Sequence, residues 1–139
     1  MEELMKTKIF KVTVERLLLN GGQTLYMVGW SLLIGTIIGM ILALILVLCR
    51  KGGLVENQPL YMIVSVYINV VRSIPFVILL VTIMPITRAI VGTTIGSTAA
   101  LVPLVVYISP YLARLMENSL LEIDPGILEA AEAMGATTW

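Results

Sequence analysis

One uncharged stretch constrains this chain more than any other feature. Residues 17–49, between Arg16 and Arg50, are thirty-three consecutive residues without a charged side chain. About 20 apolar residues cross the hydrocarbon core of a bilayer as a helix, so this stretch can cross once with residues to spare. It is too long for a cleaved secretory signal, whose apolar region runs for only about 7 to 15 residues. The sequence therefore predicts a membrane protein.

The middle of the chain is almost as poor in charge. Within residues 57–113 the only charged side chains are Arg72 and Arg88, which leaves room for two further spans. We predict an all-α, polytopic transmembrane bundle forming one domain. Its spans are expected at about residues 24–48, 60–84 and 95–112. A turn over residues 85–88 should end the second span, and residues 1–16 should lie at the membrane interface.

Composition excludes several classes of function. Nine Lys and Arg balance nine Asp and Glu, so no basic excess attracts nucleic acid. The chain has no histidine and a single cysteine, Cys49, which excludes a His/Cys metal cluster and an internal disulfide. It also lacks a Gly-x4-Gly-Lys-Ser/Thr phosphate loop, and the predicted spans hold no His, Asp or Glu to activate a nucleophile. We therefore expect no enzymatic activity, metal or cofactor in this chain.

The orientation is ambiguous from charge. Three spans put the N-terminus and the loop around Arg88 on the same side of the membrane. That side would hold Lys6, Lys8, Lys11, Arg16 and Arg88, and the other would hold Arg50, Lys51 and Arg114. The positive-inside rule then favours a cytoplasmic N-terminus. The family resemblance described below requires the opposite orientation.

Small residues recur at every fourth position of the first predicted span. They are Ser31, Gly35, Gly39 and Ala43. Such residues let helix backbones approach closely in lipid, where burial of apolar surface no longer drives helices together. The stripe predicts helix packing within one bundle, with a subunit interface as the alternative.

The second predicted span contains an arginine and a proline. Pro75 lacks an N–H and crowds the carbonyl of Val71, so a kink is expected there. Arg72 is costly inside a membrane and should face the bundle or reach the interface. Three roles remain open for it: a structural clamp on backbone carbonyls, a part in gating, or contact with substrate.

The C-terminal tail predicts one short helix over residues 125–134. Asp124 is a good N-cap, Pro125 suits the first helical position, and Gly135 can close the helix. The apolar positions on one face are Ile127, Leu128, Ala131 and Met134. So short a helix is marginal alone and must pack on something, either its own bundle or a soluble partner.

Resemblance favours the soluble partner. The string Glu129-Ala130-Ala131, followed after three residues by Gly135, resembles the start of the EAA loop of ABC importer permeases. In that family the loop continues into an Ile-x-Leu-Pro segment. Residues 72–76, 84–88, 90–96 and 119–123 resemble successive segments of methionine importer permeases. Permeases for polar amino acids have a related Arg-Gly-Thr-Pro in place of residues 72–75, which favours the methionine branch.

The resemblance implies a permease that works as a homodimer in the bacterial inner membrane. Its partners would be two cytoplasmic ATPase subunits, which bind ATP and magnesium, and an extracytoplasmic methionine-binding protein. Coupling to the ATPase would fall to Leu128, Glu129, Ala130, Ala131, Met134 and Gly135. Such permeases have about five core spans with the N-terminus outside, so the chain would supply three spans and half a coupling loop and would not transport alone.

Two alternatives remain open. The first is a permease for a polar amino acid. The second is a membrane scaffold that does not transport and whose tail helix recruits a soluble partner. A reading frame that continues beyond codon 139 into an Ile-x-Leu-Pro segment and two more apolar stretches would favour transport.

Overall fold

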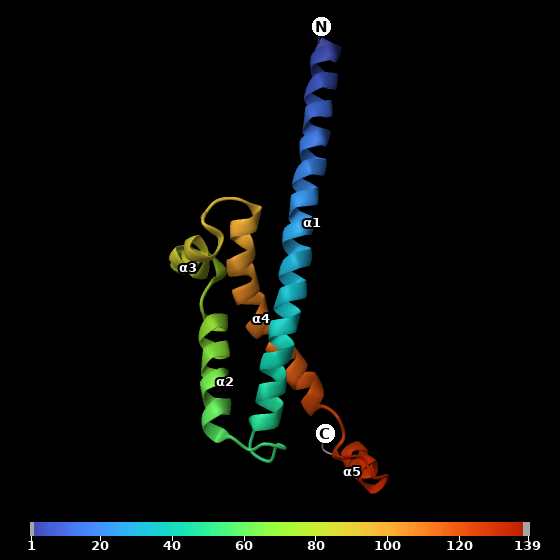
Figure 1. Cartoon of the computed structure of the whole chain (residues 1–139). Helices are drawn as coiled ribbons and strands as arrows, with labels where there is room; N and C mark the ends of the chain where they lie inside the picture. The colour runs from blue at the N-terminus through green and yellow to red at the C-terminus, as the bar shows by residue number, and fades with distance from the viewer. Residues whose placement is uncertain (1, 138–139) are drawn as a thin grey trace.

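Five α-helices make up the described part of the chain (Figure 1). The computed structural model describes the backbone of residues 2–137 and the side chains of residues 14–137, and within these bounds it has helices and no strand. The end of the predicted coupling loop, residues 138–139, lies outside the described residues. The elements are α1 (Glu2–Cys49), α2 (Gln58–Ser73), α3 (Phe76–Val91), α4 (Ser97–Leu121) and α5 (Pro125–Ala133). The predicted all-helical membrane bundle is confirmed.

The first helix is longer than expected. α1 has 48 residues, which at 1.5 Å per residue is about 72 Å, far more than the hydrocarbon core of a bilayer. Its membrane-compatible part runs over Val14–Cys49, with a mean hydropathy of 3.0. The helix begins well before residue 24, because no proline interrupts residues 2–49, and it continues from the segment expected at the interface into the span. The start of the span at about residue 24 stays a prediction.

The second predicted span is broken into two helices. α2 and α3 meet at 115°, a sharper change of direction than the expected kink. Ile74, before the proline, takes the extended conformation that such residues favour. Its N–H donates to the carbonyl of Val71 at 3.3 Å, so the carbonyl that Pro75 would crowd is satisfied within α2. The prediction of one kinked helix over residues 60–84 is therefore wrong.

The expected turn at residues 85–88 is also wrong. Pro85 lies inside α3, which continues to Val91 and ends at Gly92, whose φ is 82°. A proline within a membrane helix removes one backbone hydrogen bond without ending the helix. A left-handed φ, in contrast, is reached easily by glycine and stops the helix there.

The third span extends further than expected. α4 runs over Ser97–Leu121 rather than residues 95–112, and so includes Arg114 and Glu117. Glu117 is 3% exposed within the described chain. An ion pair with Arg114, at 2.6 Å, offsets the charge of the carboxylate and lets the helix continue.

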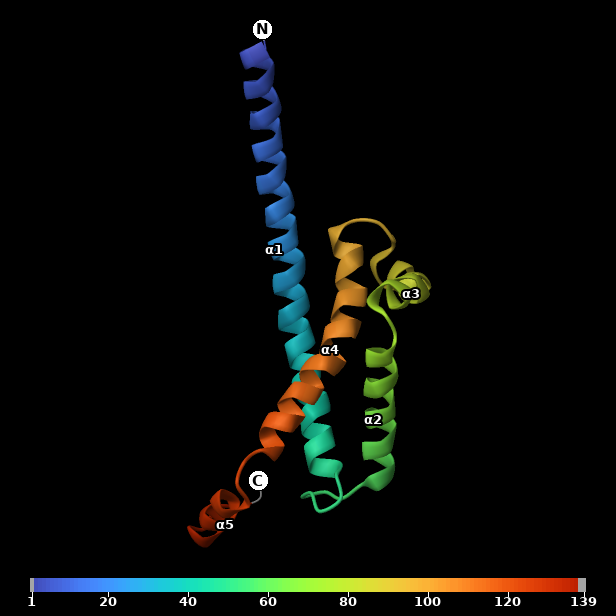
Figure 2. The same ribbon diagram turned by 180° about the vertical axis from the view of Figure 1, so that it is seen from behind.

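Both views of the ribbon show the same arrangement (Figures 1 and 2). α4 packs along α1 and crosses it, α2 lies beside the end of α1 and contacts both α1 and α4, and α3 lies crosswise near the end where α4 begins. Buried Leu46, Ile68 and Ala113 join α1, α2 and α4 in a small core. If α2 and α3 together count as one span, the chain crosses three times. The N-terminus and α5 then lie at opposite ends of the molecule.

Candidate functional site

The short helix α5 is fixed at both ends by hydrogen bonds. The Asp124 carboxylate accepts from the N–H of Gly126 at 2.8 Å, and Pro125 begins the helix. At the other end Gly135 has a φ of 87°. The N–H of Gly135 donates to the backbone carbonyl of Glu132 at 2.9 Å. The N–H of Ala136 donates to the backbone carbonyl of Ala131 at 3.0 Å. This pair of bonds is a Schellman motif, which needs a left-handed residue at the position of Gly135.

The apolar face of α5 is uncovered. No residue of α5 is buried. The exposed fractions are 63% for Ile127, 61% for Leu128 and 84% for Met134. Among the other residues expected to couple, Glu129 and Ala130 are exposed and Ala131 is half-buried. A helix too short to be stable alone thus leaves most of its apolar stripe exposed.

A cleft of about 640 Å³ separates α5 from the end of α1. Its lining includes Leu128 and Glu132 of α5 and, opposite them, Arg50, Lys51 and Leu54 of the loop after α1. Leu54 is 62% exposed. Only one edge of α5 therefore faces its own chain, and Met134 lies outside the cleft.

Arg72 and Pro75 flank the break between α2 and α3. The guanidinium carbon of Arg72 lies 5.9 Å from the centroid of the Tyr111 ring on α4, within the range of a cation–π contact. The side chain is exposed and belongs to the last turn of α2, where a positive charge complements the helix dipole. Arg72 thus contacts α4, and a part in gating or in substrate contact stays a hypothesis.

The small-residue stripe of α1 faces α4. Its members Ser31, Gly35, Gly39 and Ala43 are all buried. A Cβ added to Gly35 would overlap Cγ2 of Ile108, and one added to Gly39 would lie 3.0 Å from the Ser109 carbonyl oxygen. The structure therefore places the stripe within one bundle, where it lets the backbones of α1 and α4 approach.

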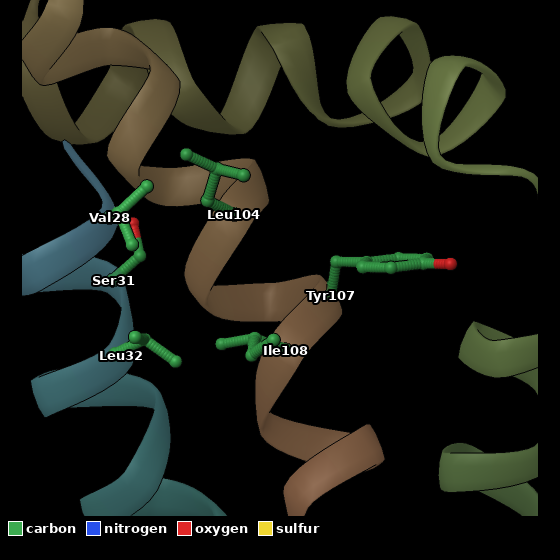
Figure 3. A pocket seen from close by; sticks show the side chains of 6 residues that line it. All are labelled: Val28, Ser31, Leu32, Leu104, Tyr107 and Ile108. Carbon is green, nitrogen blue, oxygen red and sulfur yellow. The ribbon is translucent and has the colours of Figure 1, made fainter. Parts of the chain in front are cut away.

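Near the start of this stripe lies an apolar pocket of about 160 Å³ (Figure 3). Val28, Ser31 and Leu32 line it from α1, and Leu104, Tyr107 and Ile108 line it from α4. The Tyr107 ring points away from α1 and packs edge-on against Phe76, with 5.2 Å between ring centroids. The Ser31 hydroxyl donates to the Met27 carbonyl at 2.6 Å. The pocket therefore offers no free polar group to orient a polar substrate.

A polar cluster between α2 and α4 was not predicted. Arg114 pairs with Glu117 at 2.6 Å and donates to Ser65 Oγ at 2.5 Å and to Asn69 Oδ1 at 3.2 Å. The i, i+3 spacing of an arginine and a glutamate at the end of a span was the available signal. Its partners on α2 are 45 and 49 residues away, which no local pattern reveals.

Fold and site together define a polytopic membrane protein with a short C-terminal helix whose apolar side chains are exposed. The chain belongs to the family of binding-protein-dependent transport system inner membrane components, whose model matches residues 35–139. The D-methionine transport system permease protein MetI of Escherichia coli (strain K12) is 50% identical to it over 115 residues. These residues are 83% of this chain and 53% of that protein, so the chain spans about half the length of this relative.

Solved structures agree with this assignment. An inward facing conformation of the MetNI methionine ABC transporter has a chain that matches with a TM-score of 0.79 and 49% identity, covering 84% of this chain and 54% of the other. The crystal structure of an amino acid ABC transporter with histidines matches with a TM-score of 0.71 and 26% identity, covering 94% and 58%.

Proposed function

We propose that this chain forms part of the permease subunit of an ATP-driven ABC importer for methionine. The observation that carries the proposal is α5, a capped helix with an uncovered apolar face at the end of the third crossing. It bears the sequence Glu129-Ala130-Ala131 and ends at Gly135. Membership of a family of transport components supports this interpretation.

In this proposal α5 is a helix that docks in a groove of a soluble ATPase subunit. Leu128 and Met134 supply apolar anchors, which is the usual way an amphipathic helix binds a groove. Ala130 and Ala131 let the partner surface approach closely, and Glu129 offers it a charge. Gly135 fixes the direction in which the chain leaves the helix.

The remaining partners follow from the same proposal. Two ATPase subunits bind ATP and magnesium and close on the nucleotide, since this chain has no phosphate loop and is not itself an enzyme. A second copy of the permease completes the path, and an extracytoplasmic binding protein delivers substrate. The movement of α5 rocks the bundles, so that access alternates around a central site.

The proposed orientation places α5 in the cytoplasm and the N-terminus outside. Single cysteines test it in a Cys49→Ser background, with Met134→Cys on α5 and Ile95→Cys in the loop before α4, both 84% exposed. A membrane-impermeant maleimide added to intact cells should label Ile95→Cys alone. Labelling of Met134→Cys alone would reverse the orientation and remove α5 from the ATPase.

Docking is tested by co-purification of the full-length protein with its ATPase. Leu128→Asp places a charge on the uncovered apolar face and should abolish the complex. Ile95→Asp is the matched control, because Ile95 is 84% exposed in the loop before α4, outside the predicted coupling helix. If the variants lose the ATPase equally, or if neither loses it, α5 is not the docking helix.

Methionine is favoured as substrate over other amino acids. The relative that is 50% identical is named for D-methionine, and the structure at 49% identity is a methionine transporter, whereas the one crystallised with histidines is 26% identical. Uptake of labelled methionine by the reconstituted complex should be inhibited by excess unlabelled methionine and not by histidine. Uptake of histidine without uptake of methionine would select the polar amino-acid permease.

A further inference from the structure

In the polar cluster between α2 and α4, the two terminal nitrogens of Arg114 bind groups on different helices. Arg114 uses one nitrogen, Nη1, for Glu117 of its own helix and the other, Nη2, for Ser65 and Asn69 of α2. Ser65 and Asn69 are four positions apart, so they lie on one face of α2. The planar guanidinium can hold both sides at once, which a lysine ammonium does less well. Arg114 thus bridges the two helices.

Glu117 fixes where the bridge can form. Arg114 and Glu117 are the only charged residues of α4, and the carboxylate is 3% exposed. A buried carboxylate needs a partner, so Glu117 holds Nη1 of Arg114 and leaves Nη2 pointing at α2. The ion pair with Glu117 therefore orients the guanidinium of Arg114 toward α2.

The rest of the contact between α2 and α4 is slight. α4 packs far more extensively on α1 than on α2. At its other end α2 is separated from α3 by the 115° break. α2 also contacts α1, about as much as it contacts α4. Within the described residues, the bridge supplies the side-chain hydrogen bonds that join α2 to α4.

The bridge also lies close to α5. Glu117 is four residues before the end of α4, and only residues 122–124 separate α4 from α5. At 1.5 Å per residue, Glu117 is about 6 Å along the axis from the end of α4. Arg114 is therefore closer to α5 along α4 than Ile108 is, the residue that Gly35 of α1 contacts. A displacement of α5 should move Arg114 first.

We propose that Arg114 is a positioning residue, held by Glu117, that links α2 to α4 so that α2 follows when α5 moves. This inference rests on the proposed function, because α5 moves only if an ATPase acts on it. Ser65 and Asn69 are the receiving groups on α2. Without them α4 moves with α5 and α2 stays behind.

The test variant is Ser65→Ala with Asn69→Leu. Tyr61→Phe is added to it, because the Tyr61 hydroxyl of α2 also interacts with Arg114. The combined variant removes these partners on α2 and leaves the ion pair of Arg114 and Glu117 intact, so no buried charge loses its partner. The control is Ser73→Ala with Thr82→Val on the same broken span. The hydroxyls of Ser73 and Thr82 donate within their own helices, at 2.7 and 2.8 Å, and link nothing across the bundle.

Two measurements on the full-length protein and its ATPase in proteoliposomes decide the matter. The first is the ATP hydrolysed per methionine transported, which should rise about fivefold or more in the test variant, the lower end of usual coupling effects. The second is the α2–α4 distance between spin labels at Met62→Cys and Leu115→Cys, two exposed positions, in a Cys49→Ser background. A non-hydrolysable ATP analogue should split this distance into two populations in the test variant only.

The outcomes separate this inference from the function on which it rests. An unchanged coupling ratio and a single distance population in the test variant would overturn the link while wild-type transport stands. If the wild type shows no ATP-driven uptake, the proposed function fails. The distance without nucleotide still decides the link in that case: a broader distribution in the test variant supports it, and a distribution identical to wild type overturns it.

Discussion

The two faces of α4 differ in how they hold their neighbours. Toward α1 the contact is extensive and made by small residues, with the backbone of Gly39 close to Ser109. Toward α2 it is slight and depends on the hydrogen bonds of one arginine. Close packing has low compressibility and transmits displacement, so α1 and α4 should move together. In the inference drawn above, α2 follows them through the hydrogen bonds of Arg114.

The largest expected effect on stability comes from breaking the ion pair of Arg114 and Glu117 on the α2 side of α4. Glu117→Leu leaves the half-buried guanidinium of Arg114 without its carboxylate, which should lower the free energy of unfolding by about 3 kcal/mol, the lower end for breaking a buried pair. Unfolding of the full-length protein in mixed micelles, titrated with denaturing detergent, measures it. The control Glu122→Leu changes an exposed glutamate and should stay within about 0.5 kcal/mol.

A double variant sharpens the same point. Arg114→Leu with Glu117→Leu removes both charges together and should recover most of the stability lost in Glu117→Leu, because no buried charge remains unpaired. A double variant as unstable as the single one would show that the carboxylate stabilises the bundle through some contact other than Arg114.

The next largest effect is expected at the close contact between α1 and α4. Gly35→Val places a side chain where Ile108 of α4 already lies, and overpacking of this kind costs about 1–3 kcal/mol. The matched control is Gly29→Val on the same helix, where an added Cβ meets nothing within 4 Å. The same unfolding titration compares the two. Equal losses would mean that the stripe on α1 does not govern its approach to α4.

The smallest effect concerns α5 alone. Asp124→Ala removes the N-cap bond to Gly126 and should weaken the helix by about 1 kcal/mol. Because α5 docks only when helical, its affinity for the ATPase should fall about fivefold, while unfolding of the bundle is unchanged. Asp124→Asn keeps an acceptor and should bind as wild type. Surface-immobilised ATPase measures both, and normal affinity of Asp124→Ala would contradict a docked helix.

Local signals in the sequence were enough for α5. Asp124, Pro125 and Gly135 define its ends through groups no more than a few residues apart, and each is where the sequence placed it. The end of the first span before Arg50 was predictable for the same reason, since the apolar run stops there. Features that depend on neighbours within about one turn can be found without the fold.

The break between α2 and α3 and the polar cluster between α2 and α4 could not be predicted in this way. Pro75 predicted a change of direction, but its size depends on what α3 packs against, and Pro85 with similar local chemistry lies inside a helix. Only the fold shows that Arg114 pairs with Glu117 and also donates to two side chains of α2.

The coupling role of α5 is the central claim, and Gly135 tests it most directly. Its φ of 87° is strained for any branched residue, so Gly135→Val should disturb the exit from α5 while its apolar face stays intact. Gly92→Val is the matched control, because Gly92 ends α3 with a φ of 82° and also has open space around its Cα.

The measurement is the number of ATP molecules hydrolysed per methionine imported by the full-length protein reconstituted with its ATPase and binding protein. We predict that Gly135→Val raises this ratio about tenfold and that Gly92→Val leaves it near the wild-type value. A Gly135→Val protein that imports methionine at the wild-type ratio would contradict the claim that α5 transmits the work of the ATPase.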